Sequence, residues 1–322
     1  MVEDMKYVVY GAGAVGGVIG AHLHLAGLPV TLVARGAHLE AIRSGGLLLD
    51  AGDGRHRIEA PATDTAAEVD WTDDTVVLLA VKSHQAAVAL ADLRAHAPAD
   101  VPVVCATNGI ATESAALRLF ERTYAVCVML PATHLEPGVV VAGCHPTPAI
   151  LDIGHFPGGT DETTAAVAAD LRAAGIESEE RDDVMAMKRR KLVMNLGNGI
   201  DASFAQGDAA NELAERAQAE GERVLAAAGL TVVPAEEDRE RRGSILQRRP
   251  DLERRGGSTW QSLTRGTGDS EIDYLAGEVV LQGRLHGVPT PVNDAVVAAT
   301  RHLAATGGAA RSLDATEVLA RV

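Results

Sequence analysis

Tyr7-Val8-Val9-Tyr10-Gly11-Ala12-Gly13-Ala14-Val15-Gly16 contains an apolar, strand-like run that leads directly into a G-x-G-x-x-G turn, and this combination indicates the fold class. The apolar spacing of residues 18–23 then predicts a helix. Gly11 allows the tight turn, Gly13 lets the backbone approach a pyrophosphate, and Gly16 lets the helix pack closely on the strand. The amino end of the helix offers free N–H groups to that pyrophosphate. The stretch therefore predicts a dinucleotide-binding βαβ unit whose cofactor-binding turn comprises Gly11, Ala12, Gly13, Ala14, Val15 and Gly16.

The composition excludes several classes of protein. A chain of 322 residues suits two domains, each with its own core. Hydrophobic residues make up 47% of it, yet no apolar run reaches the roughly 18 residues of a membrane span. The charged start shows no signal-peptide pattern, so we expect a cytoplasmic location. The formal charge of -15 would repel nucleic acid and acidic membranes, and we expect neither as a partner.

Short β-branched runs recur through the first half, with alanine- and leucine-rich helical patterns between several of them. This alternation predicts an α/β fold with a Rossmann-type, doubly wound parallel sheet in an N-terminal domain over residues 1–181. We expect a mainly helical C-terminal domain over residues 182–322 that binds substrate and mediates dimerisation. The predicted strands are residues 30–33, 76–79, 101–104, 125–129 and 149–154, with a hairpin over 46–50 and 56–59 and a helix over 163–174.

An arginine-rich stretch lies in the second half, between Pro234 and Gly257. Almost as many acidic residues stand beside these arginines, and mixed signs at helical spacing predict a solvated face rather than a nucleic-acid site. The arginines are Arg239, Arg241, Arg242, Arg248, Arg249, Arg254 and Arg255.

Arg35 indicates which dinucleotide is bound. In an NAD-preferring site the second strand ends in an acidic residue that holds the ribose 2′-hydroxyl. Here Arg35 follows the predicted strand, and its guanidinium can pair with a 2′-phosphate. We therefore expect NADP(H) as the cofactor, the alternative being a surface arginine at a strand end.

Two further polar residues follow predicted parallel strands, at the edge where open α/β sheets bind ligands. Lys82 follows the strand over residues 75–81, and Asn108 follows the strand over residues 101–106. Either alone would be an ordinary loop residue, but with the glycine turn they outline one crevice. We expect both to line the cofactor site.

A polar face is expected on the helix that opens the second domain. Lys191, Asn195 and Asn198 are spaced i, i+4 and i+7, which places an amine and two amides on one side of that helix. The alternative is a solvent-facing polar stripe opposite the apolar side of the helix.

Other chemistries find little support. The chain has no His-Glu-x-x-His pattern and no Cys-His cluster, so we predict no metal. It also has no Gly-x-Ser-x-Gly elbow, which argues against acyl transfer. Cys105, Cys127 and Cys144 are odd in number and sit in or beside apolar runs, and we expect buried free thiols.

The motifs together resemble those of the ketopantoate reductases (2-dehydropantoate 2-reductases). The resemblance covers essentially the whole chain. It rests on the glycine turn with Arg35, the strand ends at Lys82 and Asn108, and three elements of the second domain. Those elements are the helix Arg190-Lys191-Leu192-x-x-Asn195, the Ser258-x-x-Gln261 element and Glu271-Ile272-Asp273-Tyr274-x-x-Gly277.

The resemblance implies roles for these residues. Lys191 would be the general acid that protonates the carbonyl oxygen as NADPH delivers hydride to the keto carbon of a small 2-oxo acid. Glu271 would bind the substrate hydroxyl near Lys191. Asn195, Asn198 and Ser258 would hold substrate oxygens, while Lys82 and Asn108 would line the nicotinamide and ribose end, with Asn108 also touching substrate.

The chain departs from the family pattern at two places. Gly199 occupies the position of the family's second asparagine, and Asn198 stands one residue earlier; Gln261-Ser262 replaces the frequent Gln-Asp. Among small 2-oxo acids, we expect 2-dehydropantoate to be the substrate. The alternatives are a reductase of a different branched or hydroxylated oxo acid, and a non-catalytic NADP(H)-binding regulatory protein. The presence of both Lys191 and Glu271 argues against the regulatory protein.

Overall fold

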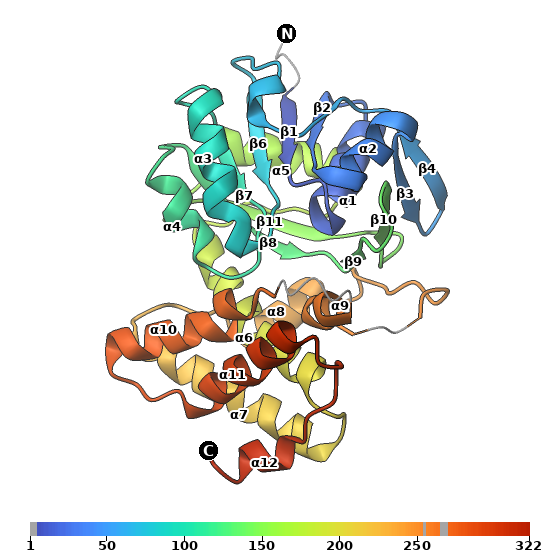
Figure 1. Ribbon diagram of the computed structural model, residues 1–322. Coiled ribbons are helices and arrows are strands. Elements are labelled where there is room, and N and C mark those ends of the chain that lie inside the picture. The colour runs from blue at the N-terminus through green and yellow to red at the C-terminus, as the bar shows by residue number, and fades with distance from the viewer. Residues whose placement is uncertain (1–4, 254–255, 265–269) are drawn as a thin grey trace. The chain divides into compact units, whose positions relative to one another are not determined.

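The computed structural model describes residues 5–253, 256–264 and 270–322 (Figure 1). The chain forms two compact units that interleave along the sequence. The first comprises residues up to 107, 112–185 and 239–252, and the second comprises 108–111, 186–238 and 253–322. The sequence analysis predicts a single boundary after residue 181. It does not predict that residues 108–111 belong to the second unit or that residues 239–252 belong to the first. The charged start at residues 1–4 and the arginines Arg254 and Arg255 lie outside the described residues.

A seven-stranded sheet forms the centre of the first unit. Its strands β5-β2-β1-β6-β7-β8-β11 lie in that order, and all neighbouring pairs are parallel except β8 with β11. The predicted Rossmann-type sheet is therefore confirmed. The strands are β1 (Lys6–Tyr10), β2 (Val30–Val33), β5 (Ala62–Thr63), β6 (Thr75–Leu79), β7 (Val103–Cys105), β8 (Thr123–Met129) and β11 (Ile150–His155).

Helices cover both faces of this sheet (Figure 1). Alternate residues of β1 enter different cores: Tyr7 and Val9 belong to one, Val8 and Tyr10 to the other. A strand buried on both faces explains why its sequence is an unbroken apolar run. The helices are α1 (Ala14–Leu25), α2 (Gly36–Gly45), α3 (Ala86–His96), α4 (Thr112–Leu117) and α5 (Glu162–Ala173), with short 3-10 helices η1 (Ala66–Glu68) and η2 (Ser83–Gln85).

The predicted hairpin is present and belongs to a second sheet. Its strands β3 (Leu47–Ala51) and β4 (Gly54–Ile58) pair antiparallel, with Leu47 opposite Ile58. Two strands that the sequence analysis did not identify complete this sheet in the order β4-β3-β10-β9. They are β9 (Ala132–Thr133) and β10 (Val139–Ala142).

The second unit is helical, as predicted. Its core gathers Leu192, Leu196 and Ile200 with residues of the later helices, such as Val279 and Val296. The helices from residue 184 onward are α6 (Val184–Ser203), α7 (Asp208–Ala227), α8 (Ala235–Arg242), α9 (Ser258–Thr264), α10 (Ala276–His286), α11 (Pro291–Thr306) and α12 (Ala315–Leu319), with the 3-10 helix η3 (Ile272–Tyr274).

The segment Arg239–Leu252 belongs to the first unit, and buried arginines hold it there. Arg241 donates from Nε and Nη2 to the carboxylate of Asp152, at 2.9 and 2.7 Å. Arg249 donates from Nη1 to Asp50 Oδ1 at 2.9 Å. The two arginine side chains are only 10% and 7% exposed. The prediction of a solvated face is wrong for these two arginines, because strands distant in sequence supply them with carboxylate partners.

Candidate active site

The glycine turn of the first unit combines close packing with open space. Gly11 has a φ of +104°, and a Cβ there would lie 2.8 Å from Val81 Cγ1. A Cβ on Gly16 would lie 2.9 Å from Ala80 Cβ. By contrast, a Cβ on Gly13 would have no atom within 4 Å. Gly11 and Gly16 are therefore required by the protein's own packing, whereas Gly13 leaves room for a group that is not part of the chain.

Hydrogen bonds fix the turn at its start. The N–H groups of Gly11 and Ala12 both donate to the carbonyl oxygen of Val33, at 3.0 and 2.9 Å. Helix α1 then begins at Ala14, so the N–H groups of Ala14, Val15 and Gly16 belong to its first turn, which has no intrahelical acceptors. This arrangement fits an anionic phosphate such as the pyrophosphate of a dinucleotide.

His38 on α2 clamps the same turn, and the sequence analysis did not identify it. Its Nδ1 accepts from the N–H of Gly138 at 2.9 Å. Nε2 must then carry the hydrogen, and it donates to the carbonyl oxygen of Ala12 at 2.7 Å. The ring lies against His134, with 4.1 Å between ring centroids. Burial, with a smaller contribution from His134, lowers the pKa of His38, which favours the neutral ring that this bridge requires.

Arg35 and Lys82 lie at the carboxyl ends of β2 and β6, as the strand pattern indicates. Arg35 is exposed and precedes α2 as its N-cap. Its guanidinium lies close to the Tyr10 hydroxyl, which donates to Asp92 at 2.6 Å. Burial and Asp92 raise the pKa of Tyr10 to about 12, against the opposing effect of Arg35. Lys82 is the half-buried N-cap of η2 and follows Val81, which contacts Gly11.

The second unit brings Lys191 and Asn108 together. Lys191 Nζ donates to Asn108 Oδ1 at 2.8 Å, although the two residues are 83 positions apart. Gly109 has a φ of +76°, and a Cβ there would lie 2.7 Å from the carbonyl oxygen of Tyr274. The segment 108–111 therefore packs closely on η3 and presents Asn108 to the lysine. The sequence analysis did not predict this hydrogen bond, because no local pattern links a strand-end asparagine to a later helix.

Asn195 and Asn198 lie together on α6, as their helical spacing predicts. Asn198 Nδ2 donates to Asn195 Oδ1 at 3.2 Å. A Cβ on Gly257 would lie 3.4 Å from Asn198 Oδ1, so the asparagine side chain lies against the residue that precedes Ser258. Ser258 begins α9 and is exposed. Three of the predicted substrate-binding residues are thus close neighbours.

Gly199 faces the helical core and has no space for a side chain. A Cβ there would lie 2.7 Å from Ile272 Cδ1 and 3.0 Å from Val296 Cγ1. Ile272 directly follows Glu271, the half-buried N-cap of η3. An asparagine at position 199 would therefore collide with the present core, whereas Asn198 is accommodated beside Asn195. The departure from the family pattern has a packing reason.

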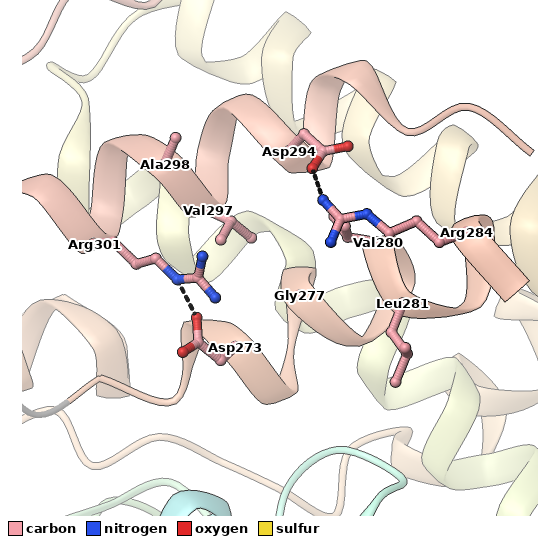
Figure 2. A pocket seen from close by; sticks show the side chains of 9 residues that line it. All are labelled: Asp273, Gly277, Val280, Leu281, Arg284, Asp294, Val297, Ala298 and Arg301. Carbon is pink, nitrogen blue, oxygen red and sulfur yellow. Dashed lines mark hydrogen bonds and ion pairs between the residues drawn. The ribbon is translucent and has the colours of Figure 1, made fainter.

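Two residues of the motif from Glu271 to Gly277 lie at a surface hollow of the second unit. Asp273 and Gly277 line a surface hollow of about 220 Å³ (Figure 2). Asp273 accepts from Arg301 Nε at 2.7 Å there, and Arg284 donates to Asp294 at 3.0 Å (Figure 2). Because both carboxylates are paired with arginines on the protein, this hollow offers no unpartnered charge to a substrate. Asp273 is therefore occupied by Arg301 on the protein surface.

Other site classes find no support in the described parts of the chain. Cys105, Cys127 and Cys144 are buried and are not in disulfides, as predicted. Within residues 5–253, 256–264 and 270–322, no group of three His, Cys, Asp or Glu side chains is arranged to hold a metal ion. Over the same residues, the helices lack the length and apolar character needed to cross a bilayer.

A doubly wound sheet with an open glycine turn, together with a lysine–amide face on a helical unit, defines a nicotinamide-dependent oxidoreductase. The chain belongs to the ketopantoate reductase family. The family model described as "Ketopantoate reductase PanE/ApbA" matches residues 7–158, and its C-terminal counterpart matches residues 183–304. The resemblance found in the sequence motifs is therefore confirmed.

Individual relatives agree with this assignment. A 2-dehydropantoate 2-reductase of Mesorhizobium japonicum is 30% identical, with 94% of this chain and 99% of the relative covered. A Pyrococcus horikoshii protein of the same name is 26% identical, with 95% and 100% covered. Among solved structures, a ketopantoate reductase from Ralstonia eutropha is 27% identical, with a TM-score of 0.80 and 94% and 99% covered. A D-mandelate dehydrogenase with NADH shares the fold, at a TM-score of 0.79, 23% identity and 94% and 99% covered.

Proposed function

We propose that this protein reduces 2-dehydropantoate to pantoate with NADPH, a step of pantothenate biosynthesis. Relatives over nearly the full length carry the name 2-dehydropantoate 2-reductase. The observation that carries the proposal is the hydrogen bond from Lys191 to Asn108. Lys191 lies on α6, the helix that also carries the Asn195–Asn198 pair. This contact supports the proposal, because an ammonium near amides could donate a proton while the amides bind the oxygens of a hydroxylated oxo acid.

In the proposed reaction the bound cofactor supplies hydride to the keto carbon. Lys191 donates a proton from Nζ to the carbonyl oxygen, so that the carbonyl becomes a hydroxyl and the amine is left neutral. Before the transfer, the ammonium stabilises negative charge on that oxygen. Asn108 holds the ammonium through its Oδ1 and thereby restricts the direction in which Nζ can donate.

The remaining predicted residues would bind the rest of the substrate. Glu271, at the start of η3, would accept a hydrogen bond from the substrate's hydroxyl group. Asn195 and Asn198 would donate to its oxygens, and Ser258 would bind the carboxylate from the exposed first turn of α9. In the first unit, the turn at residues 11–16 and Lys82 would hold the dinucleotide.

Arg35 supports NADP(H) as the cofactor, because it is exposed at the end of β2. Arg35→Asp should weaken NADPH binding much more than NADH binding, by roughly tenfold or more, since the new carboxylate repels the 2′-phosphate. Cofactor titrations measure this effect. Arg43→Asp is the control, because Arg43 lies on α2, the helix that follows Arg35, but is paired with Glu68. An unchanged preference in Arg35→Asp would show that the 2′-phosphate is bound elsewhere.

The experiment that tests the substrate measures NADPH oxidation with 2-dehydropantoate and a panel of other branched or hydroxylated 2-oxo acids. The highest kcat/KM is expected for 2-dehydropantoate. A clear preference for another acid would assign the chain to that substrate and show that the Asn198–Gly199 arrangement changed the specificity. Binding of NADPH without turnover of any acid would instead favour a regulatory protein.

A cytoplasmic location and a homodimer are part of the same proposal. Leu281 and Leu285 on α10 are 47% and 66% exposed, and such side chains are common where subunits meet. Light scattering measures the mass directly. A monomeric mass at working concentration would remove the dimer from the proposal.

A further inference from the structure

Asp201 on α6 connects three parts of the second unit. Its Oδ1 accepts from Arg311 Nη2 at 2.7 Å, and its Oδ2 accepts from the N–H of Gly257 at 3.3 Å. Arg311 Nε also donates to the main-chain carbonyl of Asp201 at 3.0 Å. One carboxylate thus joins the arginine to the residue that immediately precedes Ser258.

Arg311 adopts a backbone conformation that side chains rarely allow. Its φ is +59°, in the left-handed region, and its N–H donates to the carbonyl oxygen of Ala202 at 2.8 Å. A non-glycine residue in this region is strained and persists only where its surroundings compensate. The forked hydrogen bonds to Asp201 supply that compensation.

Arg311 also contacts α9. Its Cζ lies 5.6 Å from the centre of the Trp260 ring, within the range of a cation–π interaction. A Cβ on Gly256 would overlap the side chain of Trp260, so the chain folds tightly over this ring. The first turn of α9 is therefore held at Gly257 by Asp201 and at Trp260 by Arg311.

We propose that Asp201 and Arg311 are positioning residues that set Ser258 relative to Asn195 and Asn198, and thereby set the affinity for the carboxylate of the 2-oxo acid. The inference rests on the proposed function. Asp201 lies three residues after Asn198 on α6, so the anchor and the substrate-binding amides share one helix. Because Arg311 donates to Asp201 and lies against Trp260, we expect it to act through the position of α9.

The first test compares Arg311→Ala and Asp201→Asn with Arg284→Ala. The control removes an exposed ion pair of the same unit, to Asp294. KM for 2-dehydropantoate should rise about tenfold in the two test variants, with kcat within about threefold and NADPH affinity unchanged, because the chemistry and the first unit are untouched. Arg311→Lys keeps the charge but loses the forked hydrogen bonds, so its KM for 2-dehydropantoate should lie between those of the parent and of Arg311→Ala. An unchanged KM would overturn the proposal. So would a higher KM that is accompanied by a lower kcat, a lower NADPH affinity and a lower Tm, because that pattern indicates general unfolding.

A second readout does not depend on turnover. The chain has two tryptophans, so Trp71→Phe leaves Trp260 as the only tryptophan emitter. Titration with 2-dehydropantoate should change its emission, and in a Trp71→Phe, Arg311→Ala double variant the half-saturation point should move to about tenfold higher acid. If the parent turns over no 2-oxo acid, the proposed function fails while this titration still tests the positioning role. Identical titrations in the two proteins, or no response in either, would refute it.

Discussion

The glycine turn of the first unit and the Lys191 helix of the second both carry functional groups next to glycines. The residues that leave no room for a side chain at those glycines differ between the two regions. In the turn, a Cβ on Gly16 would meet Gly11 and Val9 of its own βαβ unit as well as the more distant Ala80, and the motif can be recognised within ten residues. On α6, the three atoms nearest to a Cβ on Gly199 all belong to later helical elements, in Ile272, Val296 and Thr300, and none belongs to a residue nearby in the chain. A functional motif can therefore be locally determined in one unit and determined by tertiary packing in the other.

The largest expected effect separates the two regions by function. Lys191→Ala should lower kcat by about 10² or more, because it removes the proposed proton donor, while NADPH affinity stays nearly unchanged. Stopped-flow turnover and cofactor titration measure the two quantities. Lys191→Arg is the matched variant, since it keeps the charge but donates a proton poorly. Turnover in Lys191→Ala equal to that of the parent would exclude the lysine from this role.

The next comparison lies within the turn itself. Gly16→Ala should lower the free energy of unfolding by about 2–3 kcal/mol, because the new Cβ meets Gly11 and Ala80. Gly13→Ala should leave stability nearly unchanged, because its φ is -74° and the space is open, but weaken NADPH roughly tenfold. Urea unfolding and cofactor titration distinguish the two variants. Equal stability losses at both positions would contradict the division between packing and ligand space.

A smaller effect is expected on α6. Gly199→Ala should lower the free energy of unfolding by about 1–3 kcal/mol, since its Cβ would lie 2.7 Å from Ile272 Cδ1. Gly197→Ala should raise it by about 0.5–1 kcal/mol, because a Cβ there would meet only Gln218 Nε2 at 4.0 Å. Adding Ile272→Val to Gly199→Ala removes the clashing methyl and should recover part of the loss. No recovery would show that the core around Gly199 is not the cause.

The smallest effect concerns the His38 clamp. Because the pKa of His38 is lower in the folded protein than its usual value near 6.5, the unfolded chain binds the proton more readily. The stabilisation is complete above about pH 7 and is lost as the pH falls through about 6.5 toward the lower folded-state pKa. Unfolding of the parent and His38→Gln at about pH 7.5 and 5.5 measures this contribution. An equal loss of stability in the two proteins on acidification would assign it to other groups.

Sequence patterns alone predict the doubly wound sheet, the hairpin, the helical second unit and the shared helix face of Asn195 and Asn198. Each depends on residues close together in the chain, where strand alternation, helical spacing and glycine turns act directly. Other features appear only in the tertiary structure: the carboxylate partners of Arg241 and Arg249, the hydrogen bond from Lys191 to Asn108, and the lack of room for a side chain at Gly199. These features join residues tens to hundreds of positions apart, and contacts of that kind depend on which surfaces the fold packs together rather than on any local pattern.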